Sequence, residues 1–200
     1  HPDQHQRASL SYEGHGQQRE LKIPKRDILH PFRQDVNRGQ LPAVSWLVGP
    51  ANFTDHPSTP WYGSWYVSEV IDILTQNPEV WKKTIFVLTY DENDGYFDHV
   101  PPFVAPDPRN PATGKCSAGI DTTVEYIPLE QELQQGIPKR EARGGPIGLG
   151  FRVPLIVASP WTRGGYVCSE VFDHTSTLKF LETFLNKKFG KNIHESKERK

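Results

Sequence analysis

The chain has 200 residues, a length that suits one domain or part of a larger one. Its formal charge is −1, with 23 basic and 24 acidic side chains, and this balance argues against a nucleic-acid partner. No apolar run approaches the roughly 20 residues of a transmembrane helix, so no membrane-spanning segment is predicted. Cys116 and Cys168 are too few for a disulfide scaffold or a structural zinc cluster. The sequence does not decide whether these two cysteines form a bridge.

The composition favours a loop-rich globular protein. The 16 glycines and 18 prolines exceed average usage, while 36% of the residues are hydrophobic and can build a core. The first residue is His1 and methionine is absent. We therefore expect the chain to be part of a longer protein, with no signal peptide to be read in these residues.

The first 50 residues are expected to hold one helix and one strand. Residues 1–24 are polar and without periodicity, which predicts an irregular lead-in. Residues 25–38 have apolar residues on one helical face, so a short helix ended by Gly39 is expected to complete the lead-in over 1–40. The run 43–48 is apolar and bounded by turn residues, which predicts a buried strand.

The middle of the chain is expected to contain a helix, a strand and a long loop. Residues 64–76 carry apolar side chains at helical spacing, so an amphipathic helix is predicted there. Its apolar stripe consists of Val67, Val70, Ile71 and Leu74. Residues 84–90 are β-branched and aromatic without a breaker, which predicts a strand. Residues 101–150 are dense in proline, glycine and charge, and we expect a long functional loop or insertion.

The C-terminal part repeats the alternation of strand and helix. Residues 153–159 predict an apolar strand, Asp173 is expected to cap a helix, and residues 191–200 form a charged tail. Apolar strands that alternate with amphipathic helices predict an α/β fold, with a mostly parallel sheet covered by helices on both faces. In this interpretation residues 41–190 belong to the folded domain.

An acidic cluster follows the clearest strand, at the edge where open α/β sheets bind ligands. Asp91-Glu92-Asn93-Asp94-Gly95 places three carboxylates within four residues. Carboxylates this close favour a hard divalent cation, and the alternative interpretation is a solvated turn. A helix–loop–helix calcium loop is excluded, because its sixth and twelfth positions would be Tyr96 and Pro102. The place at a strand end favours a metal site.

Three Asp-His pairs are further candidates: Asp55-His56, Asp98-His99 and Asp173-His174. A carboxylate beside an imidazole can set its protonation and make it a general acid. Such pairs also form turns and helix caps, and Asp173-His174 best fits a cap. For the other two pairs both interpretations stay open.

Several blocks, in order along residues 41–185, resemble bacterial phosphocholine-preferring phospholipases C, a family that also includes acid phosphatases. One block is Tyr90-Asp91-Glu92-Asn93-Asp94-Gly95-Tyr96-Phe97-Asp98-His99-Val100-Pro101-Pro102. The other blocks are residues 41–46, 55–58, 77–84, 148–154, 159–165 and 172–176. The resemblance implies an alkaline-phosphatase-like catalytic domain that is incomplete here, these residues being its C-terminal part.

The resemblance also implies an activity, namely hydrolysis of a phosphoester at a divalent-metal site. Asp91 and Glu92 would bind the metal, with Ca²⁺, Mg²⁺, Mn²⁺ and Zn²⁺ not distinguished. His56 would contact the phosphoryl group or the leaving oxygen. Asp55 stands where the family usually has glutamate, and its shorter arm weakens a role for it. Candidates for supporting the site from outside the metal ligands are Asp55, Asn93, Asp94, His99 and His174.

The implied substrate is a phospholipid of the phosphatidylcholine type, cleaved to diacylglycerol and a phosphorylated headgroup. Aromatic faces attract the quaternary ammonium of choline, and the candidates are Trp61, Tyr62 and Tyr96, for which ordinary packing is the alternative. A phospholipid substrate requires transient contact with a membrane surface. Members of the family are usually exported, which implies a secreted or periplasmic protein.

Two parts of the family pattern are absent from these 200 residues. One is an N-terminal Glu-Asn-Arg-Ser-Phe-Asp-His block that supplies metal ligands, and the other is the segment with the Thr or Ser nucleophile. We expect both to come from the rest of the same catalytic domain, and the chain alone to be inactive. The alternatives are an acid phosphatase that uses the same site on phosphomonoesters, a non-catalytic cation-binding module, and a folding unit without binding of its own.

Overall fold

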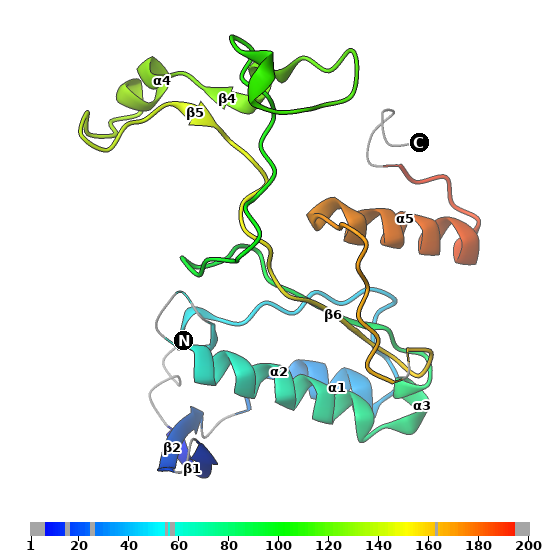
Figure 1. The fold of residues 1–200 in the computed structure, drawn as a ribbon. Helices are drawn as coiled ribbons and strands as arrows, with labels where there is room; N and C mark the ends of the chain where they lie inside the picture. The colour runs from blue at the N-terminus through cyan, green and yellow to red at the C-terminus, as the bar shows by residue number, and fades with distance from the viewer. Residues whose placement is uncertain are drawn as a thin grey trace. The chain divides into compact units, whose positions relative to one another are not determined.

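The computed structural model describes residues 7–14, 17–24, 27–54, 56, 59–162 and 164–194, and only the backbone of residues 7–24. The chain divides into two compact units, His1–Trp161 and Thr162–Lys200, and each is treated by itself (Figure 1). The described strands form three two-stranded sheets, all antiparallel. The mixture of helices and strands agrees with an α/β chain, whereas a mostly parallel sheet is not present in the described residues.

Residues expected to be an irregular lead-in form a hairpin instead. β1 (Arg7–Gly14) pairs with β2 (Gln17–Pro24), with Leu10 opposite Leu21 and Ala8 opposite Ile23. The paired positions alternate between apolar and polar residues, a period-two pattern typical of strands. This alternation is the signal that the sequence analysis overlooked.

A small helical core holds the first unit together. α1 (His30–Asn37) packs against α2 (Pro60–Thr75), and α3 (Pro78–Trp81) follows directly. The buried core consists of Leu29, Phe32, Val36, Val70, Ile73 and Leu74. α2 begins before the predicted residue 64, because proline suits the first helical position. Asn77 joins α3 to α1, since its Nδ2 donates to the carbonyl of Val36 at 2.8 Å.

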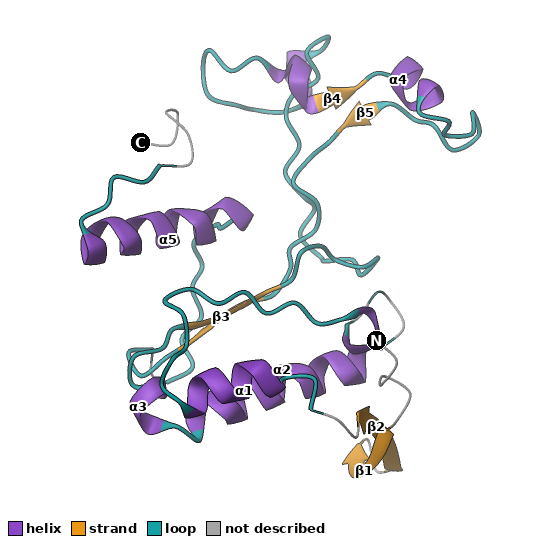
Figure 2. Ribbon diagram, turned by 180° about the vertical axis from the view of Figure 1, so that it is seen from behind, coloured by secondary structure: helices purple, strands orange, loops and turns teal. Residues whose placement is uncertain are grey.

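The two clearest predicted strands are present but pair in the opposite sense to the expected one. β3 (Phe86–Thr89) and β6 (Leu155–Ala158) are antiparallel, with Thr89 opposite Leu155. The chain leaves the end of β3, makes a long excursion and returns to the same end, so β6 runs backwards as in a hairpin with a very long loop. Phe86 packs against the helical core, and Figure 2 shows β3 alongside α2.

Residues 43–48 do not form the buried strand that was predicted. They are extended coil without a paired neighbour among the described residues, and Trp46 and Val48 are 71% and 83% exposed. An apolar run becomes a strand only when another strand offers it hydrogen bonds, and within this part of the chain β3 and β6 pair with each other.

The long excursion between β3 and β6, residues 101–152, is called the arm. It contains short elements: η3 (Pro111–Thr113), η4 (Thr122–Glu125), β4 (Tyr126–Ile127), α4 (Leu129–Gln134) and β5 (Gly145–Pro146). Its outgoing and returning segments run side by side (Figures 1 and 2), and the Leu149 N–H donates to the Phe103 carbonyl at 3.1 Å. The arm is therefore a paired excursion rather than an open loop.

The second unit is built around α5 (His174–Phe189). Asp173 caps it as predicted: its carboxylate accepts from the N–H groups of Thr175 and Ser176 at 2.8 and 3.2 Å. Lys187 and Lys188 lie in the last turn, where cations favour the helix dipole. Among the described residues, no helix combines the length and apolar character that crossing a membrane demands.

Candidate metal centre

A tight turn follows β3 and carries the acidic cluster. Its central residues, Asp94 and Gly95, have φ of +47° and +79°, and the Tyr96 N–H donates to the Asn93 carbonyl at 2.8 Å. Positive φ at both central positions is typical of turns with Asp or Asn followed by Gly. The Asn93 side chain closes the turn, because its Nδ2 donates to the Tyr96 carbonyl at 2.6 Å.

This turn brings Asp94 to Glu92 and to a histidine from another loop. One side-chain ligand atom from each of His56, Glu92 and Asp94 lies within 4.8 Å of the others. Nδ1 of His56 is 3.9 Å from Oε1 of Glu92, while Oε2 of Glu92 accepts a hydrogen bond from the Asp94 N–H. His56 and Glu92 are exposed, and Asp94 is half-buried.

The donor set suits a divalent cation. Ligand atoms on one ion at about 2.0–2.5 Å lie within about 5 Å of one another, as these do. Oδ2 of Asp94 has almost no contact with solvent and no hydrogen-bond partner among the described residues. An ionised oxygen buried without a partner is costly, and a cation would satisfy it. Two carboxylates and one imidazole accommodate Zn²⁺ or Mn²⁺ as well as harder ions.

The group contains Glu92, one of the two ligands expected from the sequence, together with Asp94, which was expected to support the site. Asp91, the other expected ligand, is not a member of the group. Asp91 is exposed, and its Oδ1 accepts from the Glu92 N–H at 3.2 Å. Its carboxylate therefore shapes the start of the turn. Asp55 lies outside the described residues.

His99 and His174 are not members of this group. His99 is exposed, and its Nδ1 is 3.0 Å from Oδ1 of Asp98. His174 is the first residue of α5 in the second unit, so it is described only with that unit. Cys116 and Cys168 are both free and exposed.

The loop that carries His56 is anchored by a residue that the sequence analysis did not single out. Phe53, at the end of η2 (Ala51–Phe53), is 3% exposed, and its ring packs against those of Tyr62 and Trp65, with centroids 5.8 and 5.6 Å apart. Gly49 lets the loop close, because a Cβ there would lie 2.9 Å from the Phe53 carbonyl oxygen. The sequence held a signal for this role: Phe53 stands three positions before His56, and the helix that follows begins with several aromatic residues with which it can pack.

A cavity of about 290 Å³ adjoins the group. It is lined by Tyr90, Glu92, Asn93, Tyr96, Phe97, Asp98, Arg152, Val153 and Pro154. Tyr96 is therefore the one predicted headgroup residue that lines this cavity. Tyr62 instead packs edge-on against Phe53, and Trp61 lies half-exposed at the start of α2.

An ion pair ties the two sides of this cavity together. The Arg152 guanidinium donates to both carboxylate oxygens of Asp98, with Nη2 3.0 Å from Oδ1. The Asp98 side chain is only 15% exposed. The hydrogen bonds from Arg152 hold the pKa of Asp98 well below its usual range, and the same bonds raise the pKa of Arg152. The pair links the turn after β3 to the segment that leads into β6.

We predict that Arg152→Gln lowers the free energy of unfolding, because the Asp98 carboxylate loses its ion pair. The size of this loss should depend on pH. A carboxyl group with a lowered pKa in the fold stabilises it above the unfolded pKa of about 3.9, and this contribution disappears as pH falls through the folded value. The difference in unfolding free energy between wild type and variant should therefore be largest near neutral pH and shrink below about pH 4. Denaturant titrations across this range measure it.

The control for this prediction is Arg38→Gln, which removes an exposed arginine at the end of α1. It should leave the pH profile of stability unchanged. A difference between wild type and Arg152→Gln that stays constant from neutral pH to about pH 3 would contradict the role of the pair.

Comparison with known proteins finds relatives named phospholipase C. The chain is 47% identical over 160 residues to the non-hemolytic phospholipase C of Burkholderia pseudomallei, which covers 80% of this chain and 21% of that protein. It is 45% identical over 152 residues to the hemolytic phospholipase C of Pseudomonas aeruginosa, covering 76% of the chain and 18% of the relative. A plant protein, non-specific phospholipase C6 of Arabidopsis thaliana, is 30% identical over 165 residues, covering 74% of the chain and 26% of the relative.

The chain thus spans about a fifth of the length of the first two curated relatives. The model of the phosphoesterase family matches residues 6–186, a stretch that includes the turn after β3, the loop of His56 and the whole arm. The chain belongs to the phosphoesterase family.

Proposed function

We propose that the protein that contains this chain, here called the whole protein, hydrolyses a phosphodiester bond of a phospholipid. The products would be diacylglycerol and a phosphorylated headgroup. The observation that carries the proposal is the group of His56, Glu92 and Asp94 beside the cavity between the turn after β3 and the segment that leads into β6. The three relatives compared above are all named phospholipase C, which supports the same reaction class.

We assign a divalent metal to this group, held by Glu92 and Asp94 with His56 at its edge. The bound ion would neutralise charge on the phosphoryl oxygens and lower the pKa of the attacking hydroxyl. The buried Oδ2 of Asp94 supports a cation at this place. Three side chains are fewer ligands than Ca²⁺ or Mg²⁺ prefers, so further ligands would come from the rest of the protein.

His56 is the residue of this chain best placed to handle a proton. Its ring is exposed and lies at the edge of the carboxylate group, so a substrate can reach it. It would stabilise the transferring phosphoryl group or protonate the leaving alkoxide of diacylglycerol. We place the nucleophile outside these 200 residues, and the chain alone is then expected to show no turnover.

We place the headgroup in the cavity lined by Tyr90, Tyr96 and Phe97. Aromatic faces attract a quaternary ammonium by about 0.5–2 kcal/mol per contact. Phe97 is held in place by an edge-on contact with Phe151, with ring centroids 5.2 Å apart.

The finer features of fold and location also belong to this proposal. β3 and β6 would be two strands of a larger, mostly parallel sheet completed by the rest of the catalytic domain. Their exposed apolar side chains, among them Val87, Ile156 and Val157, support this. Contact with membranes would be transient and at the surface, and the protein would be secreted or periplasmic.

The test compares two chromogenic substrates in the whole protein, with and without a chelator. Cleavage of p-nitrophenyl phosphorylcholine that the chelator abolishes is the expected result. Cleavage of p-nitrophenyl phosphate alone would replace the proposal by an acid phosphatase. Metal binding without turnover of either substrate would replace it by a cation-binding module.

A further inference from the structure

The loop that follows β3 is closed at both ends on one segment of the chain. This loop, residues 91–98, is called the acidic loop. Just before it begins, the Tyr90 N–H donates to the Pro154 carbonyl at 3.4 Å. At its end, the Asp98 carboxylate accepts two hydrogen bonds from the Arg152 guanidinium. The two contacts that close the loop therefore lie only two residues apart on the returning chain.

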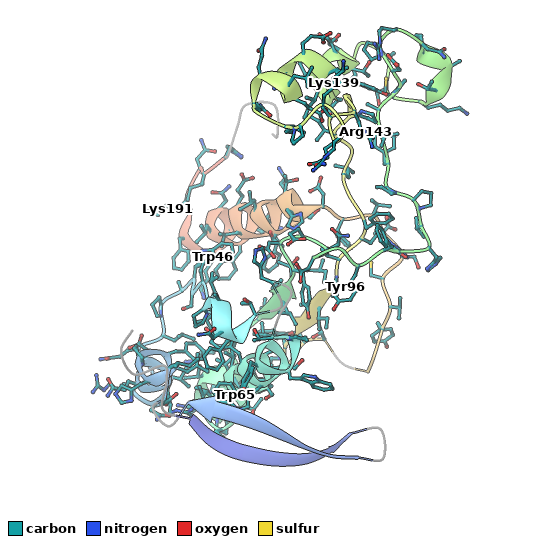
Figure 3. All side chains as sticks on the ribbon, turned by 90° about the vertical axis from the view of Figure 1, so that its left-hand side faces the viewer. Trp46, Trp65, Tyr96, Lys139, Arg143 and Lys191 are labelled. Atoms are coloured by element: carbon teal, nitrogen blue, oxygen red, sulfur yellow. The ribbon has the colours of Figure 1, made fainter. Side chains whose placement is uncertain are left out.

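Inside the acidic loop the hydrogen bonds are local. Asn93 bonds to Tyr96, the residue of this turn that Figure 3 labels, through both its side chain and its carbonyl. The Glu92 carboxylate accepts from the Asp94 N–H. These bonds join residues two or three positions apart, so they give the turn its shape without tying it to another part of the chain.

The contact at the end of the acidic loop has a defined geometry. The Arg152 guanidinium meets Asp98 through two nitrogens, Nε and Nη2. Next to this pair, the rings of Phe97 and Phe151 meet edge-on, with centroids 5.2 Å apart. A planar guanidinium that forms two bonds to one carboxylate fixes its direction as well as its distance. Two successive residues of the loop are thus held against two successive residues of the returning chain.

The acidic loop supplies two of the three side chains of the metal group, which consists of His56, Glu92 and Asp94. His56 comes from a separate loop, the one that Phe53 anchors. Side chains that hold one ion must keep their geometry to within about 0.5 Å. The position of the acidic loop relative to His56 therefore decides whether all three side chains reach one cation.

We propose that Arg152 is a positioning residue for this metal group. Through Asp98 it holds the acidic loop at the place where the two carboxylates of that loop meet His56. Two of the three guanidinium nitrogens are committed to Asp98, which favours a role through that carboxylate over direct contact with the substrate. The inference rests on the proposed function, since it takes the group to be a metal centre.

The first experiment measures metal binding. Mn²⁺, an ion that carboxylates and imidazole both accept, is titrated by calorimetry into the metal-free whole protein. We expect Arg152→Gln to weaken Mn²⁺ affinity by about tenfold, the lower end of the range for residues that orient metal ligands. Arg152→Lys should weaken it nearly as much, because an ammonium keeps the charge but does not form the two parallel bonds.

Two controls separate this role from a general effect on stability. Arg109→Gln breaks a pair of the same kind elsewhere in the arm, since Nε and Nη2 of Arg109 each lie 3.2 Å from a carboxylate oxygen of Asp107. Ile73→Val lowers stability by removing part of a buried side chain from the helical core. Both variants should bind Mn²⁺ like wild type. A loss in Ile73→Val as large as that in Arg152→Gln would show an effect of stability alone and would overturn the proposal.

A double variant tests whether Arg152 acts through Asp98. Asp98→Asn alone should weaken Mn²⁺ affinity about as much as Arg152→Gln, and the variant with both changes should bind no more weakly than either one, because both remove the same contact. Losses that add would show that Arg152 acts by another route and would contradict the proposal. Equal Mn²⁺ affinity in wild type and Arg152→Gln would also overturn it.

The second experiment follows hydrogen exchange of the acidic loop in the metal-free whole protein. The amide protons of Asp94 and Tyr96, which are hydrogen-bonded inside the loop, should exchange faster in Arg152→Gln because the loop opens more readily. They should exchange at the wild-type rate in Arg109→Gln. Unchanged exchange in Arg152→Gln would overturn the positioning role. If wild type binds no Mn²⁺ and cleaves neither chromogenic substrate, the proposed function fails, and the exchange rates still decide whether Arg152 holds the loop.

Discussion

Glu92→Gln in the whole protein is expected to lower both metal affinity and turnover by at least about 100-fold. Loss of a residue that only supports the metal ligands costs up to about 100-fold, and we expect loss of a ligand to cost at least as much. The side chain keeps its size and one oxygen that can accept from the Asp94 N–H, but it loses its negative charge and places an amide NH2 group where the other oxygen faces His56. Metal titration by calorimetry and turnover of p-nitrophenyl phosphorylcholine at saturating metal measure the two effects separately. Below saturation, turnover of the variant should be lower still and should rise in part as the metal concentration is raised.

The same measurements distinguish the two carboxylates that flank Glu92. Asp94→Asn should resemble Glu92→Gln, because Asp94 contributes its buried oxygen to the group, whereas Asp91→Asn should have a much smaller effect. Glu79→Gln, on the exposed face of α3 and paired with Lys82, is the control that removes a carboxylate elsewhere. A full loss in Asp91→Asn with wild-type behaviour in Asp94→Asn would restore the ligand pair expected from the sequence.

His56→Gln is expected to reduce turnover of phospholipid by about 10²–10⁴-fold, the usual range for loss of a general acid. The loss should depend on the leaving group. Diacylglycerol leaves as a strongly basic alkoxide that needs a proton, while p-nitrophenolate is stable without one. Turnover of p-nitrophenyl phosphorylcholine should therefore fall much less. Rates for both substrates in wild type and variant give the comparison directly.

The control for His56 is His99→Gln, which changes an exposed histidine outside the metal group. It should keep the wild-type ratio of the two rates. An equal loss on both substrates in His56→Gln, accompanied by loss of bound metal, would show that the residue acts as a ligand and not as an acid. The rates on the two substrates, together with one metal titration, therefore distinguish a general acid from a metal ligand.

Local patterns in the sequence predicted the elements well and their pairing poorly. Residues 84–90 and 153–159 contain strands because their apolar, β-branched side chains favour an extended backbone. The direction of pairing depends on where the arm returns, which no local pattern contains. Residues 43–48 have the apolar composition of a buried strand, but no described strand pairs with them. The strand predicted from composition alone was therefore wrong. Asp173 was predicted as a cap because capping needs only the next three residues.

The sequence predicted Asp91, Glu92 and His56 as site residues, and the structure groups Glu92 and His56 with Asp94. Asp94 comes close to Glu92 because two successive residues with positive φ reverse the chain, and a spacing argument does not contain that reversal. Arg152 reaches Asp98 across 54 positions of sequence, and only the folded chain brings them together.

The open edges of the β3–β6 pair have a consequence for handling the protein. Among the described residues neither strand has a second neighbour, and Val87, Ile156 and Val157 are exposed. An unpaired apolar strand edge is a template on which another copy can add its own strand. Produced separately from its parent, this stretch of chain would tend to self-associate into β-rich aggregates. To keep the protein soluble, charged residues would have to be introduced at those edges, or the chain would have to be produced together with the rest of its catalytic domain.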